Sequence, residues 1–271
     1  MDLIPKEIDA HYRQVNESER LSNGFGELER VRTLAILARH LTPPPAVVVD
    51  VGGAAGVYSF PLAQQGYQVH LIDPVELHLQ QARSRAAASG IALASITQGD
   101  ARQLHLADNS AGAILLLGPL YHLIERADRR QTLLEARRVL RPQGLLFAAA
   151  ISRFASLIDG LARGFFQDQA FREIVDADLR SGVHRNPTAN PDYFTTAYFH
   201  RPEELAAEIA EAGFANVRTF GIEGPACSAP RLREAWNDPT QRQKLLEFLT
   251  RTEQEPSLQG ASAHLLAIAE K

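Results

Sequence analysis

The stretch from Val47 to Gly56 restricts the possible folds more than any other, because it joins an apolar strand to a glycine-rich turn. Its β-branched residues indicate a strand that is buried on both faces, as in a parallel sheet. The strand carries one acid, Asp50, and glycines follow at positions 52, 53 and 56. Glycine permits a sharp turn and lets a ligand approach the bare backbone. With a helix expected over 58–65, the stretch predicts a nucleotide-binding cradle, although such a turn can also bind nothing.

Strands continue to alternate with helices up to residue 150. We expect strands over 68–72, 91–97, 113–117 and 145–150, and helices over 75–89 and 129–140. This alternation predicts a parallel, doubly wound sheet. Such sheets bind ligands outside the carboxyl ends of their strands. Four groups of residues are expected to meet at those ends: Asp50–Gly56, Asp73, Asp100 and Gly118–His122.

The flanking segments complete the predicted fold. An amphipathic helix over 27–41 precedes the first strand. Residues 151–200 break the rhythm with helical pieces and an aromatic-rich loop, which we interpret as a lid over the strand ends. The prediction is a doubly wound, mostly parallel α/β sheet of seven strands whose last strand is antiparallel. It divides the chain into four parts. Residues 1–41 form an N-terminal helical cap, 42–150 a ligand-binding core, 151–200 an inserted helical lid, and 201–271 complete the sheet.

Composition excludes several classes of function. The chain has 271 residues, with 32 acidic and 28 basic side chains, so its formal net charge of -4 disfavours a nucleic-acid partner. Its single cysteine, Cys227, excludes an intrachain disulfide and a cysteine-rich zinc site. No apolar run approaches the ~20 residues that span a bilayer, and the first residues lack a secretory signal. We therefore expect a cytoplasmic protein without a membrane partner, either a monomer or a homodimer.

Several short motifs resemble those of the class I S-adenosylmethionine-dependent methyltransferases, and most of all a small-molecule branch similar to quinone-biosynthesis enzymes. The motifs are the Asp50 turn, Asp73, Gln98–Ala101, Leu117–Leu123 and Arg138–Gly144. Each is common alone, but their order and spacing over about residues 45–150 are specific. The resemblance implies a Rossmann-like fold, S-adenosylmethionine as cofactor with S-adenosylhomocysteine as product, no metal, and a small-molecule acceptor.

The resemblance also implies roles for particular residues. The glycines would lie against the methionine part of the cofactor, Asp73 would hold the ribose hydroxyls, and Asp100 would face the adenine amino group. The complete cofactor set is Asp50, Gly52, Gly53, Gly56, Asp73, Pro74, Asp100, Ala101, Leu117 and Gly118. Asp73 also suits a helix cap, with Pro74 in the first turn. Ala54 stands where the family usually has another glycine, and its Cβ is expected to narrow the site.

Candidates for chemistry come from the loop after the fourth strand and from the insertion. His122 is the leading candidate for a general base, and Tyr121 for a wall of the methyl-transfer channel; packing against neighbouring helices is the alternative for both. Tyr198 and His200 are further catalytic candidates from the end of the insertion. The substrate candidates are Arg153, for a carboxylate, and Tyr12. His264 and Glu223 are interpreted as structural.

Three alternatives to a small-molecule methyltransferase stay open at this point. A non-catalytic protein that binds S-adenosylmethionine is motivated by Ala54. An NAD(P)-dependent oxidoreductase fits less well, because Ala54 takes the place of a glycine in the Gly-x-Gly-x-x-Gly pattern. An RNA methyltransferase is disfavoured by the acidic composition.

Overall fold

A sheet of parallel strands forms the centre of the molecule. The computed structural model describes residues 4–5, 7–8, 10–11, 21, 24–188, 190–229 and 231–271. Five strands lie side by side in the order β3-β2-β1-β4-β5, and all their pairs are parallel. Their bounds are β1 Val47–Val51, β2 Gln68–Asp73, β3 Ser95–Gln98, β4 Ala111–Leu116 and β5 Leu140–Ser152.

Two strands from the C-terminal part of the chain complete the sheet. β9 (His264–Glu270) pairs antiparallel with β5 and also antiparallel with β8 (Ala215–Gly221). β9 therefore lies between β5 and β8, and β8 forms the edge. The predicted mostly parallel sheet with an antiparallel last strand is confirmed.

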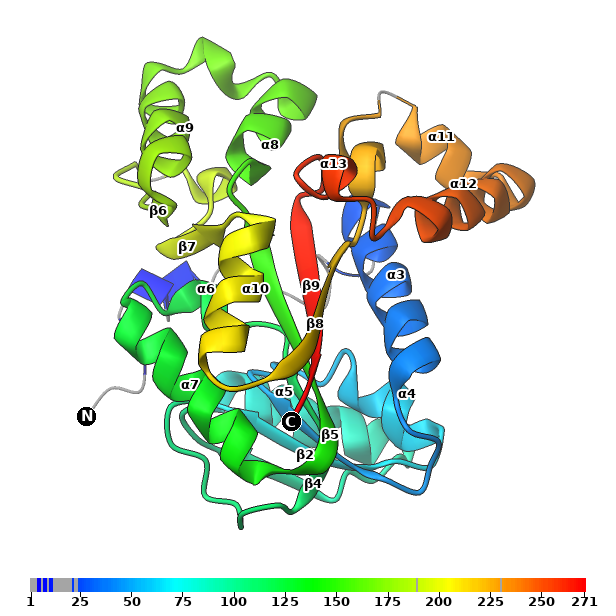
Figure 1. Cartoon of the computed structure of the whole chain (residues 1–271). Helices are drawn as coiled ribbons and strands as arrows, with labels where there is room; N and C mark the ends of the chain where they lie inside the picture. Colours follow the sequence, from blue (N-terminus) through cyan, green and yellow to red (C-terminus); the bar gives the residue numbers. More distant parts are fainter. Residues whose placement is uncertain are drawn as a thin grey trace.

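Helices cover both faces of this sheet (Figure 1). One face packs against α7 (Arg126–Val139) and α10 (Pro202–Glu211), and the other against α3 (Gly24–His40) and α4 (Ser59–Gln64). α5 (Glu76–Ser89) packs with α4 and β2. β1 and β4 are buried on both faces, which explains their continuous apolar sequences.

The segment after β5 stands over the carboxyl ends of the strands (Figure 1). It contains α8 (Ala155–Arg163), α9 (Gln169–Ser181), β6 (Val183–His184) and β7 (Ala197–His200). β7 pairs in parallel with the last two residues of β5, beyond the point where β4 ends. The segment interpreted from sequence as a lid therefore also extends the sheet.

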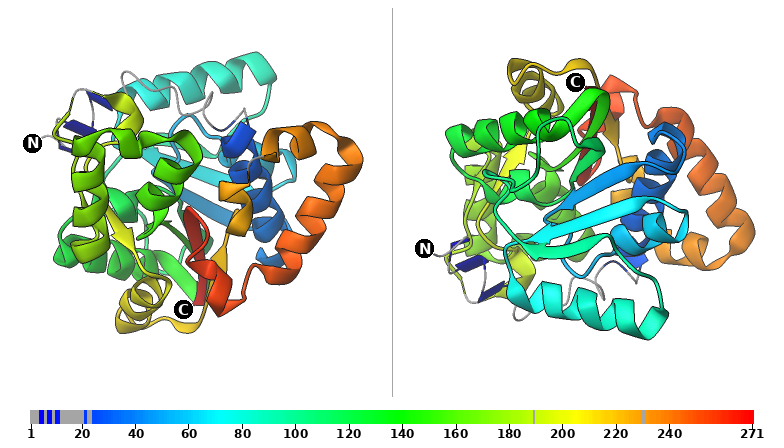
Figure 2. Two further views of the ribbon diagram at one scale, coloured as in Figure 1. Left: turned by 90° about the horizontal axis from the view of Figure 1, so that it is seen from above. Right: turned by 90° about the horizontal axis from the view of Figure 1, so that it is seen from below.

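The last helices pack beside α3. α11 (Leu232–Asn237) and α12 (Pro239–Thr252) share an apolar cluster with α3, and the short α13 (Pro256–Gln259) leads into β9. Seen from above, these helices and the insertion lie on opposite sides of the strand ends (Figure 2). Among the described residues, no helix has the length and apolar character needed to cross a membrane.

Candidate active site

A cavity of about 310 Å³ opens at the carboxyl ends of β1, β2 and β4. All four groups that the sequence analysis expected together line it. The predicted cofactor residues in its wall are Asp50, Gly52, Gly53, Asp73, Pro74, Asp100, Ala101, Leu117 and Gly118. Gly56 does not line the cavity. It has a φ of 78°, and an added Cβ would lie 2.7 Å from the Phe60 ring. Its role is therefore to allow the backbone conformation of the turn.

The turn after β1 presents bare backbone to this cavity. The amide of Gly52 donates to the carbonyl of Ile72 at 2.7 Å, which ties the turn to β2. A Cβ at Gly53 would lie 2.8 Å from the Asp50 carboxylate, so only glycine fits there. Ala54 lines the cavity in the left-handed region, with a φ of 47°, and its amide donates to Asp73 Oδ2 at 2.9 Å. This backbone contact positions Asp73, and glycine at position 54 would supply the same amide donor.

Asp50 is buried beneath the turn. Its Oδ2 accepts a hydrogen bond from Ser59 at 2.6 Å, whereas its Oδ1 has no partner among the described residues. Burial raises the pKa of Asp50 to about 6; the Ser59 hydrogen bond opposes this rise and the nearby charge of Asp73 adds to it. A buried carboxylate with an unmatched acceptor fits a ligand that brings a donor or a positive charge.

Asp73 and Asp100 are held in place by neighbouring donors. Asp73 Oδ1 accepts from the Val75 amide at 2.9 Å and lies 3.0 Å from the His78 ring nitrogen. Asp100 pairs with Arg102, whose Nη2 lies 2.6 Å from Asp100 Oδ2. Burial opposes ionisation of Asp100, but hydrogen bonds from Arg102 lower its pKa below the ordinary value. Both carboxylates are therefore held at fixed positions in the cavity wall.

The short helix α6 (Pro119–His122) forms the wall between this cavity and a second one. Tyr121 lines both cavities, and its hydroxyl donates to the Leu117 carbonyl at 3.3 Å. His122 lines the first cavity, with its ring 4.7 Å from that of Tyr121 and 6.1 Å from that of Phe194. Its role as a base stays a prediction.

The second cavity, of about 620 Å³, lies between β5, β9 and the insertion. Its wall is rich in aromatic side chains: Phe25, Tyr121, Phe171, Tyr193, Phe194 and Phe199. Ligand cavities of this size and apolar lining suit small organic molecules. We call it the acceptor cavity, and the first one the cofactor cavity.

The structure places Tyr198, His200 and Arg153 elsewhere than the sequence analysis expected, because they line neither cavity. His200 is fully buried and its Nε2 lies 3.4 Å from Glu208, and burial lowers the pKa of this histidine. The Arg153 side chain is also buried and pairs with Glu204 at 2.6 Å. These residues join β7 to α10, so we assign them to structure. Tyr12 lies outside the described residues.

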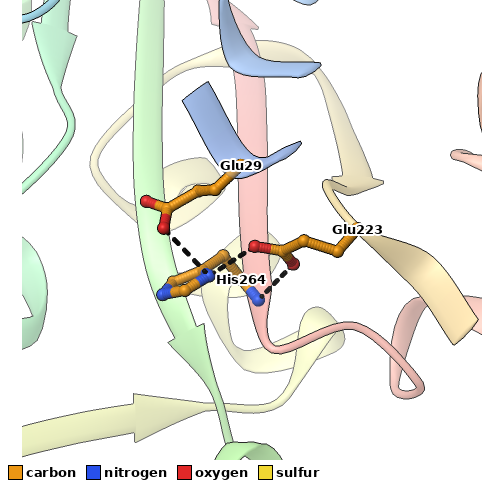
Figure 3. A group of neighbouring side chains, drawn as sticks. All are labelled: Glu29, Glu223 and His264. Carbon is orange, nitrogen blue, oxygen red and sulfur yellow. Dashed lines mark hydrogen bonds and ion pairs between the residues drawn. The ribbon is translucent and has the colours of Figure 1, made fainter. Parts of the chain in front are cut away.

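Sequence analysis missed a cluster of three ionisable side chains beside the acceptor cavity. Glu29 on α3, Glu223 after β8 and His264 on β9 point toward one another (Figure 3). Their potential metal-ligand atoms all lie within 4.8 Å of one another. This is the one group of three or more His, Cys, Asp or Glu side chains with that geometry among the described residues. The three positions are far apart in the sequence and belong to no motif, so the tertiary fold alone reveals the cluster.

The chain was then compared with known proteins. A family model described as a methyltransferase domain matches residues 48–144. A ubiquinone biosynthesis O-methyltransferase from Azorhizobium caulinodans is 30% identical over 196 residues, which are 70% of this chain and 68% of that protein. The chain belongs to the class I S-adenosylmethionine-dependent methyltransferases. A malonyl-[acyl-carrier protein] O-methyltransferase from Methylococcus capsulatus is 36% identical over 133 residues, or 46% of this methyltransferase and 45% of the relative.

Solved structures confirm the fold of this methyltransferase. The PH0226 protein from Pyrococcus horikoshii superposes with a TM-score of 0.62 at 18% identity, over 96% of this chain and 98% of the other. The cofactor is S-adenosylmethionine. The chemical groups in the cofactor cavity of the methyltransferase suit this molecule. The turn offers bare backbone, and Asp73 and Asp100 offer carboxylate oxygens. Asp50 has an unmatched acceptor for a cationic or hydrogen-donating group.

Proposed function

We propose that this methyltransferase transfers a methyl group to a hydroxyl of a small, planar and largely apolar acceptor. The observation that carries the proposal is the position of the acceptor cavity, which meets the cofactor cavity at Tyr121 and has six Phe or Tyr side chains among its lining residues. Aromatic side chains favour stacked and edge-to-face contacts with a planar ring.

The names of the relatives support an oxygen nucleophile. Both of the relatives described above are O-methyltransferases, one of ubiquinone biosynthesis and one that acts on a malonyl-carrier protein. An aromatic hydroxyl fits the acceptor cavity better than a carrier-bound carboxylate does. Among the described residues Arg163 is the one arginine in the wall, and it already pairs with Asp192 at 2.7 Å and with Asp159 at 3.3 Å.

The described residues would act mainly by positioning. Asp73 would hold the ribose hydroxyls, Asp100 the adenine amino group, and the backbone at Gly52 and Gly53 the amino-acid end. The bound cofactor supplies a methyl group that is already activated by the positive sulfur. Alignment of the acceptor oxygen with that methyl group, in a cavity closed by the insertion, can lower the barrier by ~7–11 kcal/mol. We infer that no metal takes part, and that the protein works in the cytoplasm as a monomer or homodimer.

The proposal is tested by methyl transfer to matched acceptors. The whole protein with labelled S-adenosylmethionine is supplied with catechol, aniline and benzoate, with and without a chelator. We expect label in the methyl ether of catechol, little in the products of the other two, and no effect of chelation. Calorimetric titration with S-adenosylhomocysteine checks that the cofactor cavity is intact. Faster transfer to aniline or benzoate would contradict the proposed hydroxyl acceptor.

A further inference from the structure

We infer that Arg102 sets the specificity of the cofactor cavity for the base, because its guanidinium competes with the adenine amino group for the carboxylate of Asp100. This inference rests on the proposed function, in which Asp100 faces the adenine amino group, and it names the residue that controls access to that carboxylate. Arg102 and Asp100 both line the cofactor cavity, together with Asp128 in the first turn of α7. The guanidinium pairs with both carboxylates, so it lies between two alternative partners.

The first argument is that Arg102 takes up the acceptor sites of Asp100. Asp100 Oδ1 accepts from the Arg102 amide at 2.8 Å and from Arg102 Nε at 3.0 Å. Asp100 Oδ2 accepts from Arg102 Nη2 at 2.6 Å, and Nε lies 3.1 Å from it as well. A carboxylate has about four lone-pair sites, so this one residue uses most of them. A ligand that donates to Asp100 must therefore displace part of the contact with Arg102.

The second argument is the strength of that contact. The guanidinium directs Nε and Nη2 at the two oxygens of Asp100, which is the bidentate arrangement that fixes geometry as well as charge. Hydrogen bonds between charged groups are roughly twice as strong as those between neutral groups. The amino group of adenine is a neutral donor. It therefore replaces the guanidinium at a net cost, unless Arg102 keeps a charged partner after it has left Asp100.

The third argument is that Asp128 supplies this partner. Arg102 Nη1 lies 3.2 Å from Asp128 Oδ2 while Nη2 is still bound to Asp100. The Arg102 side chain is 34% exposed, so it can turn toward Asp128 without disturbing a packed core. A guanidinium that passes from Asp100 to Asp128 releases the acceptors of Asp100 and keeps its own charge paired.

The fourth argument is that the backbone around Asp100 is held, so the movement belongs to the Arg102 side chain. The Gln103 amide donates to the Asp100 carbonyl at 3.0 Å and closes a tight turn. The Gln131 side chain on α7 donates to the Arg102 carbonyl at 3.3 Å. Asp100 also keeps its hydrogen bond from the Arg102 amide when the guanidinium leaves, because that donor is part of the turn.

The other acid of this wall, Asp73, shows the contrast. Its carboxylate accepts from the amides of Ala54 and Val75, each at 2.9 Å. Backbone donors such as these stay in place when a ligand arrives, whereas the guanidinium on Asp100 ends a flexible side chain. Access to Asp100 therefore depends on where Arg102 lies, and this dependence is what gives Arg102 control over the base.

The arrangement predicts how two kinds of base are distinguished. Adenine carries an amino group, which can donate to Asp100 once the guanidinium has turned to Asp128. Hypoxanthine carries an oxygen at the same position, which accepts from Arg102 where it stands but is repelled by the carboxylate of Asp100. Arg102 therefore weakens the binding of adenine and favours the 6-oxo base. Its removal should raise the preference of the cavity for adenine.

The test measures the binding of two ligands to the whole protein by calorimetric titration. One is S-adenosylhomocysteine, and the other is S-inosylhomocysteine, in which an oxygen replaces the amino group of the base. For Arg102→Met we expect S-adenosylhomocysteine to bind about three- to fivefold more tightly, the size of a partly exposed ion pair, and S-inosylhomocysteine to bind no more tightly than before. Arg102→Lys, which keeps the charge and loses the planar fork, should show a smaller gain. Arg83→Met removes an exposed arginine whose ion pair lies outside both cavities, and it is the matched control.

A second substitution tests the alternative partner. Asp128→Asn should weaken the binding of S-adenosylhomocysteine by about three- to fivefold, because Arg102 then has no charged group to which it can pass. The same substitution should have no effect when residue 102 is already methionine, because the two residues act on one side chain. Equal effects of Asp128→Asn with and without Arg102 would overturn the inference.

A third variant, Asp100→Ala, separates this inference from the proposed function. It should weaken the binding of S-adenosylhomocysteine by about tenfold or more and that of S-inosylhomocysteine much less. If it does so and Arg102→Met also binds S-adenosylhomocysteine more weakly, Arg102 supports the site, and the inference is overturned while Asp100 keeps its role. Unchanged affinities in Asp100→Ala would remove both the adenine role of Asp100 and the inference. Neither ligand carries a methyl group to transfer, so a failure of O-methylation would leave these results intact.

Discussion

The cofactor side and the acceptor side of this methyltransferase are built in different ways. On the cofactor side, polar groups follow the ends of consecutive strands, and backbone amides hold them: Asp73 is fixed by the amides of Ala54 and Val75. On the acceptor side, side chains from distant segments hold one another. His264 is fixed by Glu223, 41 positions away, and behind both cavities Arg129 is fixed by Glu208, 79 positions away. The first arrangement is local in the sequence, and the second exists only after folding.

This difference predicts different consequences of substitution. Changes on the cofactor side should act on cofactor affinity with little effect on stability. Changes in buried ion pairs between distant segments should act on stability, because removal of one partner leaves an uncompensated charge.

The largest effect is expected for Glu208→Ala. Glu208 accepts two hydrogen bonds from the buried Arg129, at 2.9 and 2.7 Å, and Arg129 also donates to the carbonyls of Leu123 and Ile124 in the cofactor cavity wall. We expect the free energy of unfolding to fall by about 3–5 kcal/mol, measured by urea denaturation. Glu211→Ala, which breaks an exposed ion pair on the same helix, should cost less than about 1 kcal/mol. Similar losses of unfolding free energy in both variants would show that the buried pair contributes no more to stability than the exposed one.

The same pair predicts an acid response. Burial opposes ionisation of Glu208, but Arg129 and His200 lower its pKa to about 2, from an ordinary value of 4.5. A carboxyl whose pKa is lowered by folding stabilises the folded state above its ordinary pKa. This contribution should be lost as the pH falls from about 4.5 through about 2, and Glu208→Ala should lack that part of the acid slope.

A loss of cofactor affinity is expected for Gly53→Ala. The new Cβ would lie 2.8 Å from the Asp50 carboxylate, so the turn or the carboxylate must move. A displaced turn would no longer match the cofactor, so we expect S-adenosylmethionine to bind roughly tenfold more weakly, which corresponds to about 1.4 kcal/mol. Gly112→Ala in β4, where the added Cβ meets nothing closer than 3.4 Å, is the control for calorimetric titration. Unchanged affinity in Gly53→Ala would show that bare backbone is not needed here.

Asp73→Ala should weaken cofactor binding by more than about tenfold, the size of one good hydrogen bond to a charged group. The reason is loss of the acceptors that would meet the ribose hydroxyls. A matched titration with 5′-methylthioadenosine, which keeps the ribose and lacks the amino-acid end, should show the same loss. An unchanged dissociation constant for both ligands would remove Asp73 from the ribose role.

The contrast also explains what the sequence could predict. The alternation of strands and helices, the glycine turn and the acids at positions 50, 73 and 100 were predictable, because hydrophobic period, turn chemistry and spacing are local properties of the sequence. His264 and Glu223 were interpreted as structural, because nothing in their own segments marks them and only β9 and β8 bring them together. Tyr198 and His200 show the opposite case, because they line neither cavity. They were near the expected site in the sequence, but β7 turns His200 into the core.

A smaller effect is expected from the titration of Asp50. Burial raises its pKa from 3.8 to about 6, so the folded protein holds a proton that the unfolded chain releases. The free energy of unfolding should therefore decrease as the pH rises from about 4 to about 6. Binding of the cationic cofactor should show the opposite trend and be about tenfold weaker at about pH 5 than at about pH 7. Asp50→Asn should flatten both slopes, and a pH dependence that survives in this variant would belong to another group.

The smallest effect is expected for His122→Ala. His122 lies on the wall of the cofactor cavity, and its ring lies 4.7 Å from that of Tyr121. If its role is to pack this wall, the substitution should lower turnover of catechol only severalfold, by loosening the wall. Cofactor affinity, measured by calorimetric titration, should stay nearly intact. A loss of turnover of about a hundredfold or more, with cofactor affinity unchanged, would instead assign proton transfer to His122.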